Sequence, residues 1–455
     1  MTITSRSPHD PADVIGEWEP AGGAEVAAVI DRAAAAAAGW ANTPAAARAA
    51  ALASMAGALE ERAGEVTDLV IREVGKPRSE ASGEVARGVA ILRYFAQAAL
   101  LPDGQTLPAA SPGTLLMARH RPVGVTGLVT PWNFPVAIPL WKAAPSLAFG
   151  NAAVLKPAEE APAVTLLLAE IITPHLPPGV FQVILGEAEA GRALAGHPGV
   201  AAVSFTGSVP AGREVVARVA GRGARVQAEM GGLNASVVLA DADFDRAATA
   251  IAYAAMGYAG QKCTATSRII VEDAAYAAFR DQLAAAVAAL GVLDPAKDGT
   301  LVGPVISGQA RDSALAAIAG SGGTVLAGGT ALDAPGHYLA PTLVELGSPE
   351  GPLATEEVFA PVAALLRASS AEAAVQIANG VRYGLVTSLF TQDLGRALRL
   401  ADQFDAGMVR VNAPTSGVDF HAPFGGAKQS SYGPREQGLA ARDFYTETRT
   451  VTIVP

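Results

Sequence analysis

The chain has 455 residues, too many for one hydrophobic core of ordinary size, so we expect two large domains. Hydrophobic residues make up 50% and charged residues 17%, which excludes a disordered protein and favours a compact α/β fold. The net charge of -10 argues against nucleic acid as the main partner, and a single cysteine excludes internal disulfide bonds. No signal-peptide pattern opens the chain, and no apolar run is as long as a membrane span. We therefore expect a soluble, cytoplasmic protein.

The first hundred residues are rich in Ala and Leu, with charges at helical spacing. This pattern predicts helices over residues 24–40, 44–74 and 81–100. The run Gly75-Lys76-Pro77 should end the second helix, because Gly favours helix ends and Pro cannot continue a helix. Several Pro and Gly residues then separate these helices from residues 115–120, a predicted strand that leaves the first domain.

From Val123 onward, apolar strand patterns alternate with helical ones. Strands are predicted over residues 123–130, 152–155, 180–185 and 200–205, and helices over residues 135–148, 163–172, 188–195 and 213–220. Such alternation predicts a mostly parallel, doubly wound sheet. Ligands of these sheets bind at the carboxyl ends of the strands, so the turns that follow the strands are candidate sites.

Three of these turns carry polar side chains or glycine. The Asn133 amide can stabilise an oxyanion, or it can simply cap a helix or turn. Lys156 and Glu159 can bind ribose hydroxyls, or they can form a plain surface ion pair. A carboxylate at a ribose repels a 2′-phosphate, so Glu159 favours NAD over NADP. Gly207 and Ser208 precede a helix that can hold a phosphate at its N-terminus, although an ordinary N-cap has the same pattern.

Cys263 is the only cysteine, and a lone free cysteine is more often a small buried hydrophobe than a nucleophile. Its neighbours Gln261, Lys262 and Thr264 are polar, which favours a reactive thiol instead. Glu229 offers a carboxylate that can accept a proton from the thiol or from water. Together Cys263 and Glu229 predict covalent catalysis.

Seven motifs in order resemble the aldehyde dehydrogenase superfamily over nearly the whole chain. They are residues 131–135 (PWNFP), 156–159 (KPAE), 205–208 (FTGS), 229–232 (EMGG), 260–263 (GQKC), 356–359 (EEVF) and 423–426 (PFGG). The resemblance implies a doubly wound NAD(P)-binding domain (residues 1–103 and 125–230), an α/β catalytic domain (231–438) and a small β oligomerisation sheet (104–124 and 439–455). It also implies a homodimer or homotetramer, and we expect no metal site.

The same resemblance assigns roles to residues. Cys263 would attack the aldehyde, Asn133 and the Cys263 N–H would hold the oxyanion, and Glu229 would activate the water that hydrolyses the thioester. The residues expected to bind NAD, with NADP as the alternative, are Trp132, Lys156, Glu159, Gly207, Ser208, Gly231, Glu357 and Phe359. Acylating relatives that pass the acyl group to coenzyme A generally lack the glutamate, so Glu229 implies a free carboxylic acid as product.

Residues 260–268, 418–424 and 430–438 are similar to 2,5-dioxopentanoate (α-ketoglutarate semialdehyde) dehydrogenases. That anionic substrate needs a cationic or amide partner, and the candidates are Lys262, Arg268 and His421. The helix after Asn133 carries no Arg or Gln in its first turns, so another semialdehyde or a neutral aliphatic or aromatic aldehyde remains an alternative. A non-catalytic scaffold and a thiol-dependent esterase are two further alternatives.

Overall fold

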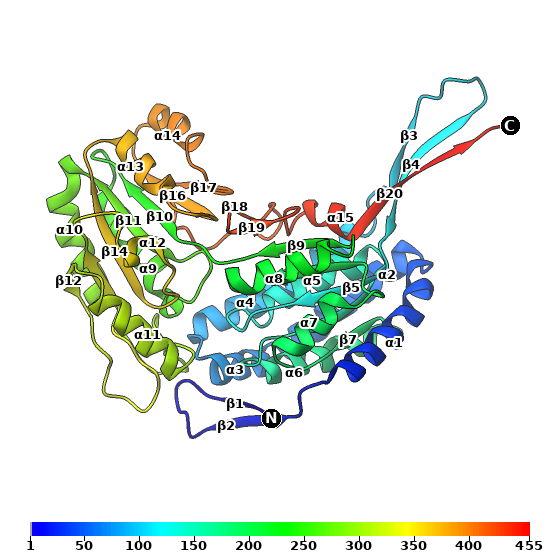
Figure 1. Cartoon of the computed structure of the whole chain (residues 1–455), viewed down its shortest axis with the longest axis horizontal. Coiled ribbons are helices and arrows are strands. Elements are labelled where there is room, and N and C mark those ends of the chain that lie inside the picture. The colour runs from blue at the N-terminus through cyan, green and yellow to red at the C-terminus, as the bar shows by residue number, and fades with distance from the viewer. Residues whose placement is uncertain (1) are drawn as a thin grey trace.

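The computed structural model describes residues 2–455 as two lobes, each built on its own sheet, with an arm that projects from the first lobe (Figure 1). The first lobe contains a six-stranded sheet in the order β19-β9-β8-β5-β6-β7. Its strands are β5 (Val125–Val129), β6 (Ala152–Lys156), β7 (Phe181–Val183), β8 (Ala202–Thr206), β9 (Arg225–Glu229) and β19 (Ser431–Tyr432). All of them run parallel except β19, which confirms the predicted doubly wound sheet.

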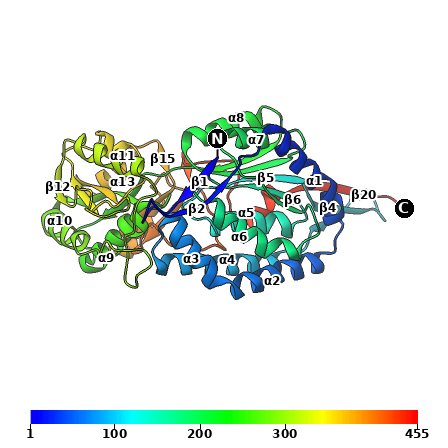
Figure 2. The ribbon, with the colours of Figure 1, turned by 90° about the horizontal axis from the view of Figure 1, so that it is seen from below.

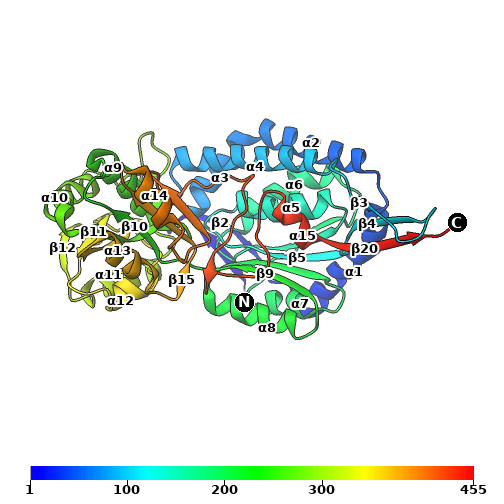
Figure 3. The same cartoon turned by 90° about the horizontal axis from the view of Figure 1, so that it is seen from above.

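Helices cover both faces of this sheet (Figure 3). One face carries α2 (Ala45–Glu61), α3 (Ala63–Val74), α4 (Arg78–Ala98), α5 (Ala137–Ala148) and α6 (Pro162–Ile172), and the other α1 (Gly23–Ala41), α7 (Ala188–Gly196) and α8 (Val209–Ala220). Side chains of a strand alternate between the two faces. Accordingly, Ala153 and Leu155 of β6 join one hydrophobic core, whereas Ala152 and Val154 join the other.

Two features near the N-terminus differ from the predictions. The helix expected over residues 44–74 is two helices, because the backbone of Arg62 leaves helical geometry at φ -103° and ψ 17°. Arg62 pairs there with Glu65, three residues later, and with Glu170, a contact across the fold that a local pattern does not contain. The hairpin of β1 (Ile3–Arg6) and β2 (Val14–Trp18) was not predicted, and it lies beneath both lobes (Figure 2).

The second lobe contains a seven-stranded sheet in the order β12-β13-β14-β11-β10-β16-β17. Its strands are β10 (Asn234–Val238), β11 (Thr266–Glu272), β12 (Thr324–Ala327), β13 (Thr342–Glu345), β14 (Val362–Ala368), β16 (Val386–Phe390) and β17 (Met408–Val411). Its helices are α9 (Phe244–Met256), α10 (Asp273–Ala288), α11 (Gly308–Ala319), α12 (Pro352–Thr355), α13 (Ala371–Asn379) and α14 (Leu394–Ala401). Only β12 is antiparallel to its neighbour. Residues 230–233 join β9 of the first sheet to β10 of the second, so the two sheets meet close to Glu229.

The arm is a three-stranded antiparallel sheet in the order β20-β4-β3. It consists of β3 (Gly104–Leu107), β4 (Leu115–Pro122) and β20 (Thr446–Ile453), and α15 (Ala440–Tyr445) leads into β20. The strand predicted over residues 115–120 is present, and the expected small β sheet from residues 104–124 and 439–455 contains β3, β4 and β20. β15 (Tyr383–Gly384) and β18 (Ala427–Lys428) form a small ladder of their own. None of the helices within residues 2–455 combines the length and apolar character needed to cross a membrane.

Two buried glutamates cap helices of the first lobe. Glu84 accepts the N–H groups of Val136 and Ala137 at the start of α5, at 2.8 and 2.9 Å. Glu73 accepts the N–H groups of Ala163 and Val164 at the start of α6, at 2.9 and 2.7 Å. A carboxylate satisfies the free N–H groups of a helix N-terminus and interacts favourably with its dipole. α3 and α4 thereby hold the helices that follow β5 and β6.

The Glu73 cap makes the stability depend on pH. Burial raises the pKa of Glu73 to about 7 in the folded chain, so the folded state binds its proton more tightly than the unfolded state. The proton bound to Glu73 stabilises the folded state. This stabilisation is complete below about pH 4.5 and is lost as the pH rises towards 7. We expect Glu73→Gln to become more stable relative to the unmodified protein between pH 5 and 8, by on the order of 3 kcal/mol. Thermal unfolding across this range measures the change.

Glu61→Gln, at the exposed end of α2, is the control. Its stability difference from the unmodified protein should be the same at each pH. A Glu73→Gln difference that is equally flat contradicts the assignment.

Candidate active site

Cys263 lies on the loop between α9 and β11, at the junction of the two lobes. The loop begins with three consecutive left-handed residues, Tyr258, Ala259 and Gly260, at φ 53°, 52° and 67°. A Cβ on Gly260 would collide with the carbonyl oxygen of Ala360, so glycine is required at that position. Left-handed geometry is costly for non-glycine residues and persists where the surroundings enforce it, typically at functional sites.

Asn234, the first residue of β10, holds the far side of this loop. Its side-chain nitrogen donates to the carbonyl oxygens of Cys263 at 2.8 Å and Ala265 at 2.7 Å. Asn234 is buried, so these hydrogen bonds are shielded from water. The second sheet thereby fixes the peptide that carries the thiol.

Cys263 forms part of the wall of two cavities. The first, of about 540 Å³, lies at the carboxyl ends of β5, β6 and β8, as expected for ligands of a doubly wound sheet. All eight residues predicted to bind the cofactor line it, together with Asn133 and Cys263. The second cavity, of about 390 Å³, also contains Cys263 in its wall and is enclosed by α4, α5 and the loop at residues 414–418.

The first cavity has groups that suit the phosphates of a dinucleotide. Ser208 is the N-cap of α8, and its side chain makes no capping hydrogen bond, so the hydroxyl is free for a ligand. The first N–H groups of α8 add donors and a positive dipole end. A Cβ on Gly207 would lie 2.6 Å from the Phe205 ring, so a larger residue does not fit at this turn.

The residues expected at the ribose and the nicotinamide also face this cavity. Lys156 is buried and donates to the carbonyl oxygen of Pro157 at 2.8 Å, whereas Glu159 is exposed. The structure shows no ion pair between Lys156 and Glu159, which argues against the alternative that they form a plain surface ion pair. Glu357 accepts the Gly232 N–H at 3.1 Å, and a Cβ on Gly231 would collide with its carboxylate. The donor and acceptor set therefore fits a dinucleotide such as NAD.

Asn133 is held by buried charges. Its backbone carbonyl oxygen accepts from Lys76 at 2.7 Å, and Lys76 in turn forms a fully buried ion pair with Glu84. The Asn133 amide nitrogen donates one hydrogen to the Gln261 carbonyl at 2.9 Å, two residues before Cys263. An amide nitrogen carries two hydrogens, so one remains for an oxyanion formed at the thiol.

Glu229 ends β9 and is buried, but it is not among the residues that line either cavity. One of its oxygens accepts from the Ser431 hydroxyl at 2.5 Å. Burial first, and then the charge of Glu436, raise the pKa of Glu229 well above its ordinary value. Glu436 itself forms a buried ion pair with Lys142, which is oriented by Ser204 at 2.7 Å. This acid therefore sits among buried charges that shift its proton affinity.

Comparison with known proteins decides the family. A model of the aldehyde dehydrogenase family matches residues 1–451. The chain belongs to the aldehyde dehydrogenase family. It is accordingly an oxidoreductase that acts on aldehydes, and the resemblance found in its motifs is confirmed.

Several characterised and solved relatives of this aldehyde dehydrogenase span the whole chain. It is 40% identical to the alpha-ketoglutaric semialdehyde dehydrogenase of Bacillus subtilis (strain 168), covering 100% of this chain and 95% of that enzyme. It is 39% identical to the alpha-ketoglutarate semialdehyde dehydrogenase of Haloferax volcanii, covering 99% of this chain and 95% of that one. The crystal structure of PnpE in complex with nicotinamide adenine dinucleotide superposes with a TM-score of 0.96 at 37% identity, covering 100% of this chain and 94% of PnpE.

The three residues predicted to bind the substrate lie in different surroundings. Lys262 lines the second cavity, but its ammonium group is buried and pairs with Glu80 at 2.8 Å. Arg268 is fully buried in the second lobe, where it donates to the carbonyl oxygens of Leu233, Ile377 and Ala378. His421 lines neither cavity. The structure thus brings Lys262 to the thiol, but neither Arg268 nor His421.

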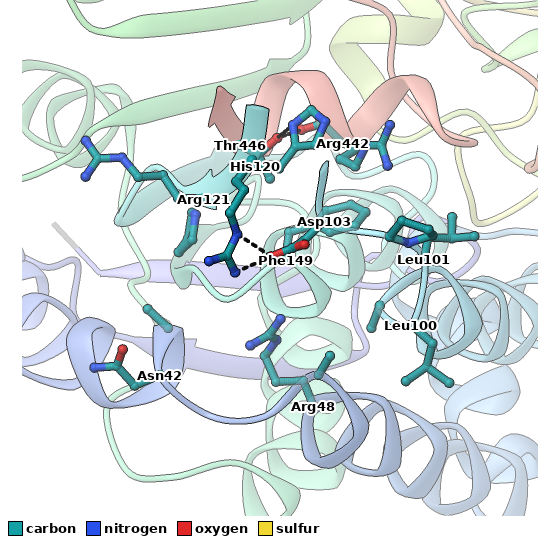
Figure 4. Close-up of a pocket in the computed structure, with 16 residues that line it drawn as sticks. Asn42, Arg48, Leu100, Leu101, Asp103, His120, Arg121, Phe149, Arg442 and Thr446 are labelled. Carbon is teal, nitrogen blue, oxygen red and sulfur yellow. Dashed lines mark hydrogen bonds and ion pairs between the residues drawn. The ribbon is translucent and has the colours of Figure 1, made fainter. Parts of the chain in front are cut away.

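A third cavity, of about 810 Å³, lies at the base of the arm and contains none of the predicted site residues (Figure 4). Three of its four arginines are already engaged. Arg119 pairs with Asp103 at 2.6 Å, Arg121 pairs with Glu447, and Arg48 donates to the Ala148 carbonyl at 2.9 Å. We therefore assign no part of the active site to it.

The positioning residues of this aldehyde dehydrogenase were not found by sequence reasoning. Lys76 was interpreted only as part of a helix stop, and Glu84 only as part of a helix. Asn234, Lys142 and Glu436 lie outside the seven motifs. Each acts through contacts with residues far away in the chain, which leave no local pattern.

The thiol of Cys263 should be protonated at neutral pH. Burial, followed by the charges of Glu357 and Glu229, raises its pKa to about 12. Because Cys263 is the only cysteine, alkylation by iodoacetamide reports on this thiol alone. We expect the alkylation rate of the cofactor-free enzyme to keep rising between pH 7 and 10. Mass spectrometry of quenched samples measures it.

Glu357→Gln removes one of the negative charges, so it should alkylate faster than the unmodified enzyme at each pH. The exposed Glu350→Gln is the control and should not change the rate. A rate that levels off between pH 9 and 10, as expected for an unperturbed thiol with a pKa of about 8.5, contradicts the assignment.

Proposed function

We propose that this aldehyde dehydrogenase oxidises 2,5-dioxopentanoate to 2-oxoglutarate, with NAD as the hydride acceptor. The observation that carries the chemistry is the position of Cys263, which forms part of the wall of both cavities. A nucleophile at such a junction can hold a substrate from one side while a cofactor reaches it from the other. Full-length identity to enzymes named for this semialdehyde supports the choice of substrate.

The reaction begins at the sulfur of Cys263. The thiol releases its proton to water, and the sulfur forms a bond with the aldehyde carbon while the C=O π electrons move to the oxygen, giving the oxyanion of a thiohemiacetal. The free hydrogen of the Asn133 amide and the Cys263 N–H stabilise the oxygen that becomes negative. Their positions are set in advance, because Lys76 and the Gln261 carbonyl orient Asn133 before substrate arrives.

NAD, when bound, accepts the hydride from the thiohemiacetal carbon, which leaves a thioester on Cys263. Ser208 and the start of α8 hold the pyrophosphate, Lys156 and Glu159 the adenosine ribose, and Glu357 and Phe359 the nicotinamide riboside. The left-handed φ of 54° at Phe359 fixes that ring against Trp132, at 5.8 Å between ring centroids. The exposed carboxylate of Glu159 disfavours the 2′-phosphate of NADP.

Glu229 completes the cycle as a general base. It takes a proton from the water that attacks the thioester carbon, and the sulfur leaves as the acid is released. A raised pKa makes this carboxylate a stronger base than an exposed glutamate. Thioester hydrolysis therefore increases with pH as the Glu229 carboxyl ionises.

We also propose that the protein works as a homodimer or homotetramer in the cytoplasm. The supporting feature is the arm, whose outer strand β20 projects from the body and is bonded on one side to β4 (Figure 1). Paired strands with a free edge favour association with another chain. The domain boundaries given above likewise remain a proposal, with β19 of the 231–438 segment joined to the first sheet.

A panel of aldehydes tests the substrate. With NAD, we expect a far higher kcat/KM for 2,5-dioxopentanoate than for propanal, succinic semialdehyde or benzaldehyde. Initial rates of NADH formation measure this, and parallel assays with NADP should show lower efficiency. Comparable efficiencies across the panel contradict the proposed substrate and leave the family unaffected.

Two variants separate acylation from deacylation. Cys263→Ala should abolish oxidation, because no other thiol is present. Glu229→Gln should lower steady-state turnover by about 100-fold to 10,000-fold, the usual contribution of a general base, yet still give a first-turnover burst of NADH. Rapid-mixing absorbance at 340 nm resolves the burst. Absence of a burst would show that Glu229 is also needed to deprotonate the thiol.

A further inference from the structure

The second cavity contains several charged side chains that are already engaged. Glu80 accepts from Lys262 at 2.8 Å and from the Tyr253 hydroxyl at 3.1 Å. Glu84 is bound to Lys76 and to the N–H groups that start α5. These groups are satisfied by the protein and have little capacity left for a ligand.

Arg87 is the exception on this wall. It lies on α4, one turn after Glu84, and lines the same cavity as Cys263. It is half-buried, and no ion pair or hydrogen bond joins its guanidinium group to any of residues 2–455. Asp419 and Glu84 attract it only from a longer distance. A guanidinium group presents five donors in a planar fork that matches a carboxylate.

Two buried polar side chains from other segments of the cavity wall also have no partner. The Ser416 hydroxyl and the Gln437 side-chain oxygen make no hydrogen bond within residues 2–455. Both residues are buried, since only 5% of Ser416 and 1% of Gln437 is exposed. Both residues line the cavity. Buried polar groups are usually satisfied in folded proteins, so these two require a ligand or water as partner. Gln437 also has a left-handed φ of 60°, a strained geometry that is typical of functional sites.

We propose that Arg87, Ser416 and Gln437 form the anchor for the 2-oxo carboxylate end of the substrate, an inference that rests on the proposed function. Arg87 pairs with the carboxylate through its planar fork. The Ser416 hydroxyl and the Gln437 amide, whose nitrogen and oxygen can exchange places by rotation, donate to the remaining oxygens of the 2-oxo acid. The aldehyde end then lies at Cys263.

The remaining wall fits the middle of such a substrate. Phe134, Trp141 and Phe424 line the cavity and offer apolar surface to two methylene groups. A cation with two neutral donors at one end and a thiol at the other selects an aldehyde that carries an anionic, oxygen-rich group. This anchor takes the place of Arg268 and His421, which the structure keeps away from the cavity.

Arg87→Met tests the anchor, because methionine keeps the bulk but loses the charge. We expect kcat/KM for 2,5-dioxopentanoate to fall about 10-fold to 100-fold, mainly through KM, the range for charge-assisted hydrogen bonds. Oxidation of pentanal, a neutral aldehyde with the same number of carbons, should stay within about 2-fold. Product inhibition by 2-oxoglutarate should weaken in parallel. Ser416→Ala should give a smaller loss, about 2-fold to 10-fold, again confined to the anionic substrate.

Arg93→Met is the matched control. Arg93 lies on the same helix α4 but is exposed and pairs with Glu60 at 2.5 Å, so neither substrate should be affected. Arg87→Lys keeps the charge without the fork and should recover part of the efficiency. These variants also show whether a loss reflects charge or misfolding.

The outcomes separate the two proposals. Equal losses for both aldehydes, or no loss for 2,5-dioxopentanoate, overturn the anchor while the proposed function stands. An unmodified enzyme that oxidises pentanal but not 2,5-dioxopentanoate overturns the proposed function, and the anchor with it.

Discussion

The buried ion pair between Lys76 and Glu84 is the interaction on which the active site depends. Both side chains are shielded from solvent. Glu84 also accepts the N–H groups at the start of α5, and Lys76 also donates to the backbone carbonyl of Asn133. The Lys76 ammonium group also lies over the Phe134 ring, at 3.7 Å from its centroid. A buried pair is tolerated only when its groups are satisfied, and removal of one partner typically costs about 3–5 kcal/mol. The proposed oxyanion donor is therefore held by buried charges and not by a flexible loop.

The second constraint is the short crossing between the two sheets. Glu229 ends β9 and Asn234 begins β10, so four residues separate the acid from the amide that holds the Cys263 peptide. Gly231 and Gly232 in this crossing leave room for Glu357 and for the Cys263 carbonyl. Such a tight connection fixes the acid, the thiol and the cofactor cavity relative to one another, which is the geometric requirement for bringing reacting groups together.

The electrostatics around the thiol follow from burial. Glu229 and Glu357 both have raised pKa values, because few solvent molecules reach them, and they in turn raise the pKa of Cys263. The buried Lys142 near Glu436 offsets part of this negative charge. Burial therefore favours the neutral forms of Cys263, Glu229 and Glu357 while no ligand is bound. Proton transfer at these groups depends on the ligands that enter the two cavities.

The sequence by itself determined the elements and the chemistry that they carry. Alternating apolar patterns located the strands and helices between Val123 and Ala220 within a few residues, because local periodicity reflects burial. The motifs at the strand ends identified residues that line the proposed cofactor cavity, since parallel strands bring their carboxyl ends to one edge. The break at Arg62 and the role of Arg87 were decided only by the tertiary structure. An arginine has the same sequence signature whether it binds backbone carbonyls, as Arg268 does, or faces a cavity unpaired, as Arg87 does. Its role depends on which distant residues surround it, and folding alone brings those residues together.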